Sequence, residues 1–228
     1  MLTYPLNKHN MKKEMIKVIM ADDHILLRNA LASLIDKSDS CKVIAEASNG
    51  KELIDGIKNE NYPDIAILDL NMPIMNGHET ALYLQKHHPK IKVLMLTMYD
   101  SELVLIRLLK AGVKGFMKKD IHPKELIHAI QSVFEKDYYY SSHTSSKLAS
   151  LFRDEDDRPI LEKITLSDSE IEFLKHVCSE QTYKEIAFDL GMNPRAIDGM
   201  RDNLFNRLDV KSRVGLAMYA IRHGVVPI

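Results

Sequence analysis

The chain has 228 residues, about one and a half times the roughly 150 residues of a typical domain, which favours two small domains over one. Lysine and arginine number 31 against 32 acidic residues, so the surface is not uniformly basic and non-selective binding of polyanions is excluded. No segment approaches the roughly 18 uncharged apolar residues of a membrane span. A local basic face remains compatible with this balance.

The cysteines and the N-terminal segment suggest an intracellular protein. Cys41 and Cys178 lie far apart and outside any C-x-x-C pair or His/Cys cluster, which predicts reduced thiols rather than a disulfide or a zinc site. Residues 1–14 contain lysines but no apolar stretch of the length that a signal peptide needs. We therefore expect a flexible N-terminal tail on a cytoplasmic protein.

Residues 15–137 alternate short, β-rich apolar runs with amphipathic segments of helix length. The expected strands span 16–21, 41–47, 64–70, 92–97 and 113–117, and the expected helices lie near 25–36, 51–60, 77–88, 101–111 and 123–136. Apolar runs separated by helix-length crossovers indicate a parallel sheet that is covered on both faces. The pattern predicts a five-stranded, doubly wound α/β domain.

Residues 138–160 break that alternation and are predicted to form an interdomain linker. They mix serines, tyrosines and acidic residues, with a short helix pattern only around 147–152. The three consecutive tyrosines could stack on nucleotides, but no basic residue accompanies them, so a solvated linker is the favoured interpretation.

Residues 161–228 show helix signals and no strand pattern. Ser167–Glu170 and Thr182–Glu185 fit the capping box that opens a helix, and Gly191 suits the left-handed position that ends one. Further helices are expected over about 194–208 and 212–223. Four short helices with a tight glycine-containing turn predict an all-α helix-turn-helix domain.

Charged and hydroxyl residues follow the predicted strands of the first domain. Asp22 and Asp23 follow the first strand, Asp69 ends the third, Thr97 ends the fourth and Lys119 follows the fifth. The carboxyl ends of parallel strands meet at one edge of the sheet, and two like charges 4 Å apart repel by about 4 kcal/mol at an effective dielectric of 20. Mg²⁺, which takes oxygen ligands, would relieve this repulsion. Each residue alone has an ordinary explanation as a cap or surface group; only the joint pattern predicts a site.

The segments ADD (21–23), LDLNMPIMNG (68–77), LTMYD (96–100) and GFMKKD (115–120) resemble, in this order and spacing, the receiver domain of two-component response regulators. The resemblance covers residues 15–137 and implies a flavodoxin-like fold. It implies that Asp69 accepts a phosphoryl group from a sensor histidine kinase. It also implies that Mg²⁺ is held by Asp22, Asp23, Asp69 and the backbone carbonyl of Asn71. Phosphoryl transfer depends on positioning and charge neutralisation more than on acid–base catalysis, and a carboxylate needs no base to act as a nucleophile at pH 7.

The same resemblance gives roles to residues around the phosphate. Thr97 and Lys119 would bind phosphoryl oxygens; Lys119 is preferred over Lys118 because it directly precedes Asp120, as in the family pattern. Phe116 matches the family's switch aromatic, which turns inward when the threonine moves toward the phosphate, and it is equally an ordinary core residue. The surface of the fourth helix, fifth strand and fifth helix would then pair with a second receiver or with the effector domain. The residues expected to tune the lifetime of the phosphate are Asn71 and Tyr99.

Residues 161–228 resemble the LuxR/FixJ-type (NarL-like) helix-turn-helix. The matching residues are Thr165–Leu166, Glu170, 184–187, 193–195, Asn203, Leu208 and 210–213. The resemblance implies sequence-specific binding of double-stranded DNA, with the helix over 194–208 in the major groove and the last helix supporting dimerisation.

The charge distribution in this domain suggests which residues would contact DNA. Residues 195–222 include six basic and three acidic residues, a net charge of +3. The candidate contacts are Arg195, Asp198, Arg201, Asp202, Asn203, Arg207, Lys211 and Arg213, with ordinary surface arginines as the alternative. Asp198 stands where the family usually has a DNA-contacting lysine, and it or Asp202 could accept a hydrogen bond from a cytosine amino group. Gly199 costs about 1 kcal/mol of helix propensity, which suggests close approach of the backbone to DNA.

The sequence therefore predicts a phosphorylation-dependent transcription regulator that dimerises on paired half-sites and has no enzyme activity beyond phosphorylation and dephosphorylation of its own aspartate. One alternative is a protein-interaction regulator whose divergent helix-turn-helix does not bind DNA, which Asp198 and Asp202 support. A second alternative is a phosphohydrolase, although the D-x-D-x-[TV] motif that a haloacid-dehalogenase-type phosphatase shows after a strand is absent. The nucleotide-binding motifs GxGxxG and GxxxxGK[ST] do not occur either.

Overall fold

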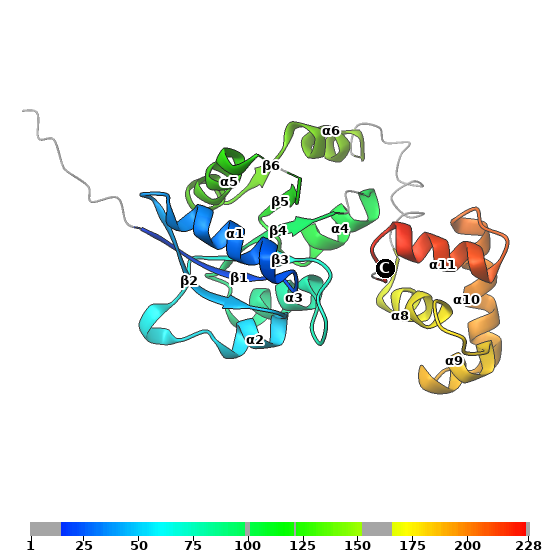
Figure 1. Ribbon diagram of the computed structural model, residues 1–228. Coiled ribbons are helices and arrows are strands. Elements are labelled where there is room, and N and C mark those ends of the chain that lie inside the picture. The colour runs from blue at the N-terminus through cyan, green and yellow to red at the C-terminus, as the bar shows by residue number, and fades with distance from the viewer. Residues whose placement is uncertain (1–14, 99–100, 121, 152–165, 227–228) are drawn as a thin grey trace, which may run out of the picture.

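The computed structural model describes residues 15–98, 101–120, 122–151 and 166–226, which form two domains (Figure 1). The N-terminal domain is built on a parallel sheet in the order β2-β1-β3-β4-β5-β6. Its strands are β1 (Ile16–Ala21), β2 (Cys41–Ala47), β3 (Ile65–Asp69), β4 (Lys92–Thr97), β5 (Gly115–Lys118) and β6 (Tyr139–Tyr140). The doubly wound α/β architecture is as predicted, but the expected number of five strands was wrong.

Helices cover both faces of this sheet. They are α1 (Ile25–Asp36), α2 (Gly50–Asp55), α3 (Gly77–His87), α4 (Glu102–Lys110) and α5 (Pro123–Lys136), with a 3₁₀ turn at Asn59–Asn61. Because side chains alternate along a strand, consecutive residues of β3 enter opposite layers. Ala66 and Leu68 pack with side chains of α2, α3 and α4, whereas Ile65 and Ile67 pack with those of α1 and α5. The fully buried β3 therefore holds Asp69 rigidly at its carboxyl end.

The sixth strand comes from the segment that the sequence assigned to the linker. Tyr139 and Tyr140 pair in parallel with Gly115 and Phe116 of β5, and α6 (Ser142–Leu151) packs against α4. The sequence predicted a helix only around 147–152, but α6 begins five residues earlier, at Ser142. A two-residue strand is too short to show alternation, and the serines of α6 conceal its helical period, so neither element stood out in the sequence.

The C-terminal domain contains four described helices: α8 (Asp168–Val177), α9 (Tyr183–Asp189), α10 (Pro194–Arg207) and α11 (Arg213–Arg222). Both predicted capping boxes form, at Ser167 and at Thr182, and Gly191 has the expected left-handed conformation with φ of 62°. Apolar side chains of all four helices share one core, which includes Phe173, Leu174, Ile186, Ile197, Leu204 and Leu216. The predicted helix-turn-helix architecture is confirmed.

The two domains meet at α4, which Figure 1 shows on the side of the sheet nearest the C-terminal domain. Leu103 of α4 is only 1% exposed and belongs to the apolar cluster formed otherwise by the C-terminal domain. A cavity of about 720 Å³ lies between α4 and the start of α8, so this contact is not close-packed. Among the described helices, none is long and apolar enough to cross a membrane.

Candidate functional site

The predicted acidic pocket forms at the carboxyl ends of β1, β3 and β5. Asp22 and Asp69 are 2% and 5% exposed, and the side chain of Lys119 is 7% exposed. The Lys119 Nζ lies 2.8 Å from Asp22 Oδ2 and 3.0 Å from Asp69 Oδ2. Three charged groups that are 97 residues apart along the chain (Asp22 to Lys119) thus meet in a buried cluster in which one cation bridges two carboxylates.

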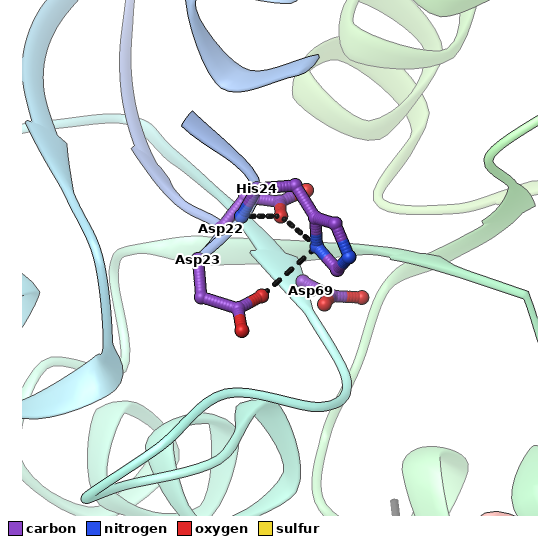
Figure 2. A group of neighbouring side chains, drawn as sticks. All are labelled: Asp22, Asp23, His24 and Asp69. Carbon is purple, nitrogen blue, oxygen red and sulfur yellow. Dashed lines mark hydrogen bonds and ion pairs between the residues drawn. The ribbon is translucent and has the colours of Figure 1, made fainter. Parts of the chain in front are cut away.

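Asp23 and His24 complete the outer side of the pocket (Figure 2). The His24 Nδ1 lies 3.0 Å from Asp22 Oδ1 and 2.9 Å from Asp23 Oδ1, and one ligand atom from each of these residues and from Asp69 fits within 4.8 Å. Three carboxylates that converge from a loop and a strand end suit a hard cation such as Mg²⁺. Sequence reasoning missed His24, although its position directly after Asp22 and Asp23 was the available signal.

Arg28 of α1 fixes the backbone beneath the metal-binding loop. Its Nη1 donates to the carbonyl of Asp22 at 2.6 Å and to that of Ala47 at 3.2 Å, and its Nε lies 3.4 Å from the Glu46 carboxylate. These bonds join the end of β1 to the end of β2. No pattern in the sequence indicates this role, because an arginine in an amphipathic helix is usually a surface residue, whereas this side chain is only 12% exposed.

The loop from β3 to α3 packs closely behind Asp69. The Gly77 amide donates to the carbonyl of Leu70 at 2.9 Å, and a Cβ on Gly77 would lie 2.1 Å from the Asp69 carbonyl oxygen, so only glycine fits. Ile74 has a φ of 67°, which is strongly disfavoured for a β-branched residue, and its side chain is 82% exposed. The loop is therefore held in a strained conformation beside the proposed phosphorylation site.

The electrostatic environment of Asp69 is unusual for a carboxylate. Its pKa is raised to about 6, mainly by burial and also by the neighbouring Asp22, while the Lys119 ammonium acts in the opposite direction. At pH 7 the group is still mostly ionised, but it is poorly solvated. A desolvated, ionised carboxylate at the floor of a pocket is well suited to attack an electrophilic phosphorus.

Other predicted residues surround this cluster. Thr97 is 1% exposed at the end of β4, and its carbonyl accepts a hydrogen bond from the Lys119 amide at 3.1 Å. Asn71 lies two residues beyond Asp69, and coordination by its carbonyl stays a prediction. Phe116 is 2% exposed in β5. Tyr99 lies outside the described residues.

Two basic residues predicted to contact DNA, Arg207 and Arg213, have partners on other helices or loops of the C-terminal domain. The Arg207 Nη2 lies 2.8 Å from Glu170 Oε2 in α8. Arg213 donates to the carbonyls of Val177 at 3.1 Å, of Ser179 at 2.8 Å and of Gln181, so it caps the end of α8. These contacts favour a structural role for both residues, and DNA contact by either one stays a prediction.

Arg201 is held between two acidic residues of its own helix. Its Nη1 lies 2.9 Å from Asp198 Oδ1, its Nη2 lies 2.8 Å from Asp202 Oδ1, and the guanidinium lies over the Tyr183 ring at 5.2 Å. The side chains of Asp198 and Asp202 are 53% and 61% exposed. The remaining predicted contacts, all exposed, are Arg195, Asn203 and Lys211. The surface of α10 thus presents carboxylates as well as cations.

Comparisons with known proteins match both domains. A family model described as the response regulator receiver domain matches residues 18–131, and one described as bacterial regulatory proteins, luxR family, matches residues 164–220. The response regulator GacA of Pseudomonas syringae pv. syringae is 31% identical over 93% of this chain and 98% of its own length. The response regulator UvrY of Escherichia coli K12 is 28% identical over 92% of this chain and 96% of its own.

Solved structures show the same fold. RcsB of Salmonella enterica serovar Typhimurium, bound to the promoter rprA, matches with a TM-score of 0.66 and 22% identity over 90% of this chain and 98% of RcsB. The response regulator ChrA of a heme-sensing two-component system matches with a TM-score of 0.51 and 24% identity over 93% of this chain and 99% of ChrA. The match to GacA and the receiver model show that the chain belongs to the response regulator family, with a receiver domain followed by a regulatory domain of the luxR family.

Proposed function

We propose that Asp69 accepts a phosphoryl group from a sensor histidine kinase and that this modification controls binding of double-stranded DNA by the C-terminal domain. The observation that carries the proposal is the buried cluster in which Lys119 bridges Asp69 and Asp22. A cluster of this kind places a nucleophile, a cation and oxygen ligands around one point, as phosphoryl transfer requires.

The chemistry at the pocket is a single displacement. A carboxylate oxygen of Asp69 forms a bond to phosphorus as the bond from phosphorus to the donor's imidazole nitrogen or acyl oxygen breaks, and the electron pair leaves with the donor. When bound by Asp22, Asp23, Asp69 and the Asn71 carbonyl, Mg²⁺ supplies charge neutralisation. The Lys119 Nζ is already 3.0 Å from Asp69 and can shift to a phosphoryl oxygen, and the Thr97 hydroxyl would bind another.

The DNA-binding part of the proposal rests on the luxR-family match and on the helix-turn-helix formed by α9 and α10. Exposed Arg195 and Lys211 would contact phosphates, and exposed Asp198 or Asp202 would accept a hydrogen bond from a cytosine amino group. Two apolar side chains one turn apart on α11, Val214 and Met218, are 70% and 53% exposed and offer a surface for a second copy. A dimer on paired half-sites would compensate for weak binding by one domain.

A first experiment tests the acceptor. Wild-type protein should become labelled by acetyl phosphate only when Mg²⁺ is present, with one phosphoryl group per chain by intact mass. Asp69→Asn should remain unlabelled, whereas Asp55→Asn, which changes an exposed acid of α2, should label like the wild type. Equal labelling of Asp69→Asn would refute the site, and many turnovers of phosphate ester per chain would instead indicate a phosphohydrolase.

The second candidate function is a protein-interaction regulator whose helix-turn-helix does not bind DNA. The observation that favours it is the pairing of Arg201 with Asp198 and Asp202, which removes free positive charge from α10. A selection from random duplexes with phosphorylated protein separates the two functions. Enrichment of a paired half-site supports DNA binding, and its absence supports the protein-interaction regulator.

A further inference from the structure

Residues 139–151 cover the edge of the receiver domain formed by α4 and β5. The Tyr139 amide donates to the carbonyl of Lys114 at 3.0 Å, and its hydroxyl donates to Glu125 Oε1 at 2.8 Å, so both ends of this residue are anchored. The pairing of β6 with β5 gives β5 a second neighbour in the sheet, besides β4. In the sequence, residues 152–165 follow α6 and join it to the C-terminal domain.

The packing beneath α6 is centred on Phe116. Tyr140 of β6 and Leu148 of α6 meet Phe116 together with Leu105 and Leu108 of α4, and the void enclosed by this group is only about 10 Å³. Displacement of a side chain in a close-packed group is unfavourable in either direction. Movement away from its neighbours opens a void, and movement toward them produces steric overlap. Any movement of Phe116 therefore weakens the attachment of α6.

The carboxyl end of β5 borders a cavity. A cavity of about 330 Å³ lies between the loop that follows Lys119 and the junction of β6 with α6, and it is lined by Asp120, His122 and Ser141 among others. Lys119 directly follows the four-residue strand β5, which contains Phe116, and its amide is bonded to Thr97. Lys119 is thus separated by only two residues from Phe116, the side chain packed under α6.

We propose that the β6–α6 segment carries the signal from Asp69 to the interdomain linker. Phosphorylation draws Lys119 from the Asp22 and Asp69 carboxylates to a phosphoryl oxygen, β5 shifts with it, and α6 loosens from α4. This inference rests on the proposed phosphorylation of Asp69. Because Leu103 on the same helix α4 contacts the C-terminal domain, loosening of α6 alters the support of that contact as well.

Thermodynamic reciprocity makes the inference testable from the α6 side. If phosphorylation loosens α6, then loosening α6 must favour the phosphorylated state by the same factor, and such couplings are typically about 5- to 150-fold. Leu148→Ser removes the apolar contact with Phe116. Ala149→Ser introduces the same serine at the next, exposed position of α6 and serves as the matched control.

The first measurement is the concentration of beryllofluoride, a phosphoryl mimic, that half-saturates the full-length chain at saturating Mg²⁺, followed by fluorine-19 NMR. We expect a roughly 5- to 150-fold lower value for Leu148→Ser than for the wild type, and an unchanged value for Ala149→Ser. Equal values for the two variants would overturn the coupling.

The second measurement follows α6 directly. The chain contains no tryptophan, so Tyr140→Trp provides a single reporter in β6. Adding Mg²⁺ and beryllofluoride should shift its emission to longer wavelength and increase quenching by acrylamide, and Asp69→Asn in the same background should abolish the change. If NMR shows that the protein has bound beryllofluoride and yet the tryptophan emission and quenching do not change, the inference is contradicted and the proposed function is unaffected. Absence of bound beryllofluoride in the wild type overturns both.

Discussion

The receiver pocket and the surface of α10 contain the same arrangement of charges in different surroundings. In each, one cation lies between two carboxylates: Lys119 between Asp22 and Asp69, and Arg201 between Asp198 and Asp202. The side chains of the receiver cluster are 4–7% exposed, whereas Arg201 is 25% exposed and its two partners more than half.

Burial decides what each arrangement can do. Charges withdrawn from water interact strongly and are barely screened by salt, so the receiver cluster responds as a unit when a phosphoryl group adds negative charge. Exposed pairs contribute little to stability and exchange partners readily. The α10 arrangement can therefore open when a nucleic acid presents competing phosphates, at small cost.

Removal of Lys119 should have the largest effect of any single change. In Lys119→Gln the two buried carboxylates lose their only bridging cation among the described residues, and the group that most lowers the pKa of Asp69 is gone. The rate of labelling by acetyl phosphate should fall roughly 100-fold or more, as for loss of one charge-stabilising donor. Lys118→Gln removes the same charge from the adjacent position. If both variants lose activity equally, the bridging role of Lys119 is wrong.

Arg213 should affect the stability of the C-terminal domain more than any exposed cation. Arg213→Ala leaves carbonyls at the end of α8 without their donor, and hydrogen bonds to charged groups contribute about 1.5–3 kcal/mol, so we expect a loss of about 2–3 kcal/mol. Lys211→Ala, at an exposed position two residues away, should change the free energy of unfolding by less than about 0.5 kcal/mol. Urea denaturation of the full chain measures both. A loss of DNA affinity in Arg213→Ala at unchanged stability would restore Arg213 as a DNA contact.

The sequence revealed more of the receiver than of the α10 surface, for physical reasons. The buried strands read as apolar runs, and parallel topology alone brings their carboxyl ends together, so the convergence of Asp22, Asp69 and Lys119 followed from strand order. No such geometric rule places Arg207 or Arg213. An arginine whose long side chain turns back onto a neighbouring helix has the same sequence signature as one that points into solvent.

Two further features escaped prediction because their signals are weak. Arg28 lies in an amphipathic helix with no sequence signal of burial, and yet its guanidinium donates to the carbonyl of Asp22. The strand β6 consists of two tyrosines, and only its pairing with Gly115 and Phe116 identifies it as a strand. Short elements whose stability depends on tertiary contacts leave little trace in local periodicity.

Neutralising Asp198 should alter DNA binding moderately and stability hardly at all. Asp198→Asn removes the ion pair with the Arg201 Nη1, so the affinity for duplex DNA should rise. If Arg201 gains a phosphate contact, the slope of log K against log salt should steepen by about 1. Glu180→Gln makes the same change in net charge at an exposed position away from α10 and should leave the slope unchanged. If affinity instead falls only for duplexes that contain a particular G·C pair, Asp198 accepts a hydrogen bond from a cytosine amino group.

The smallest expected effect concerns Gly199, which lies within α10 although nothing in the fold requires glycine there. A Cβ at this position would meet no atom within 4 Å, and its φ is not positive. Gly199→Ala should therefore stabilise the C-terminal domain by about 0.5–1 kcal/mol, because alanine loses less backbone entropy in a helix. Thermal unfolding measures the change in stability, and a filter-binding assay of the same variant measures its affinity for DNA. If stability rises while DNA affinity falls, the glycine is kept so that the backbone of α10 can approach the bases; if affinity is unchanged, close approach is not the reason for the glycine.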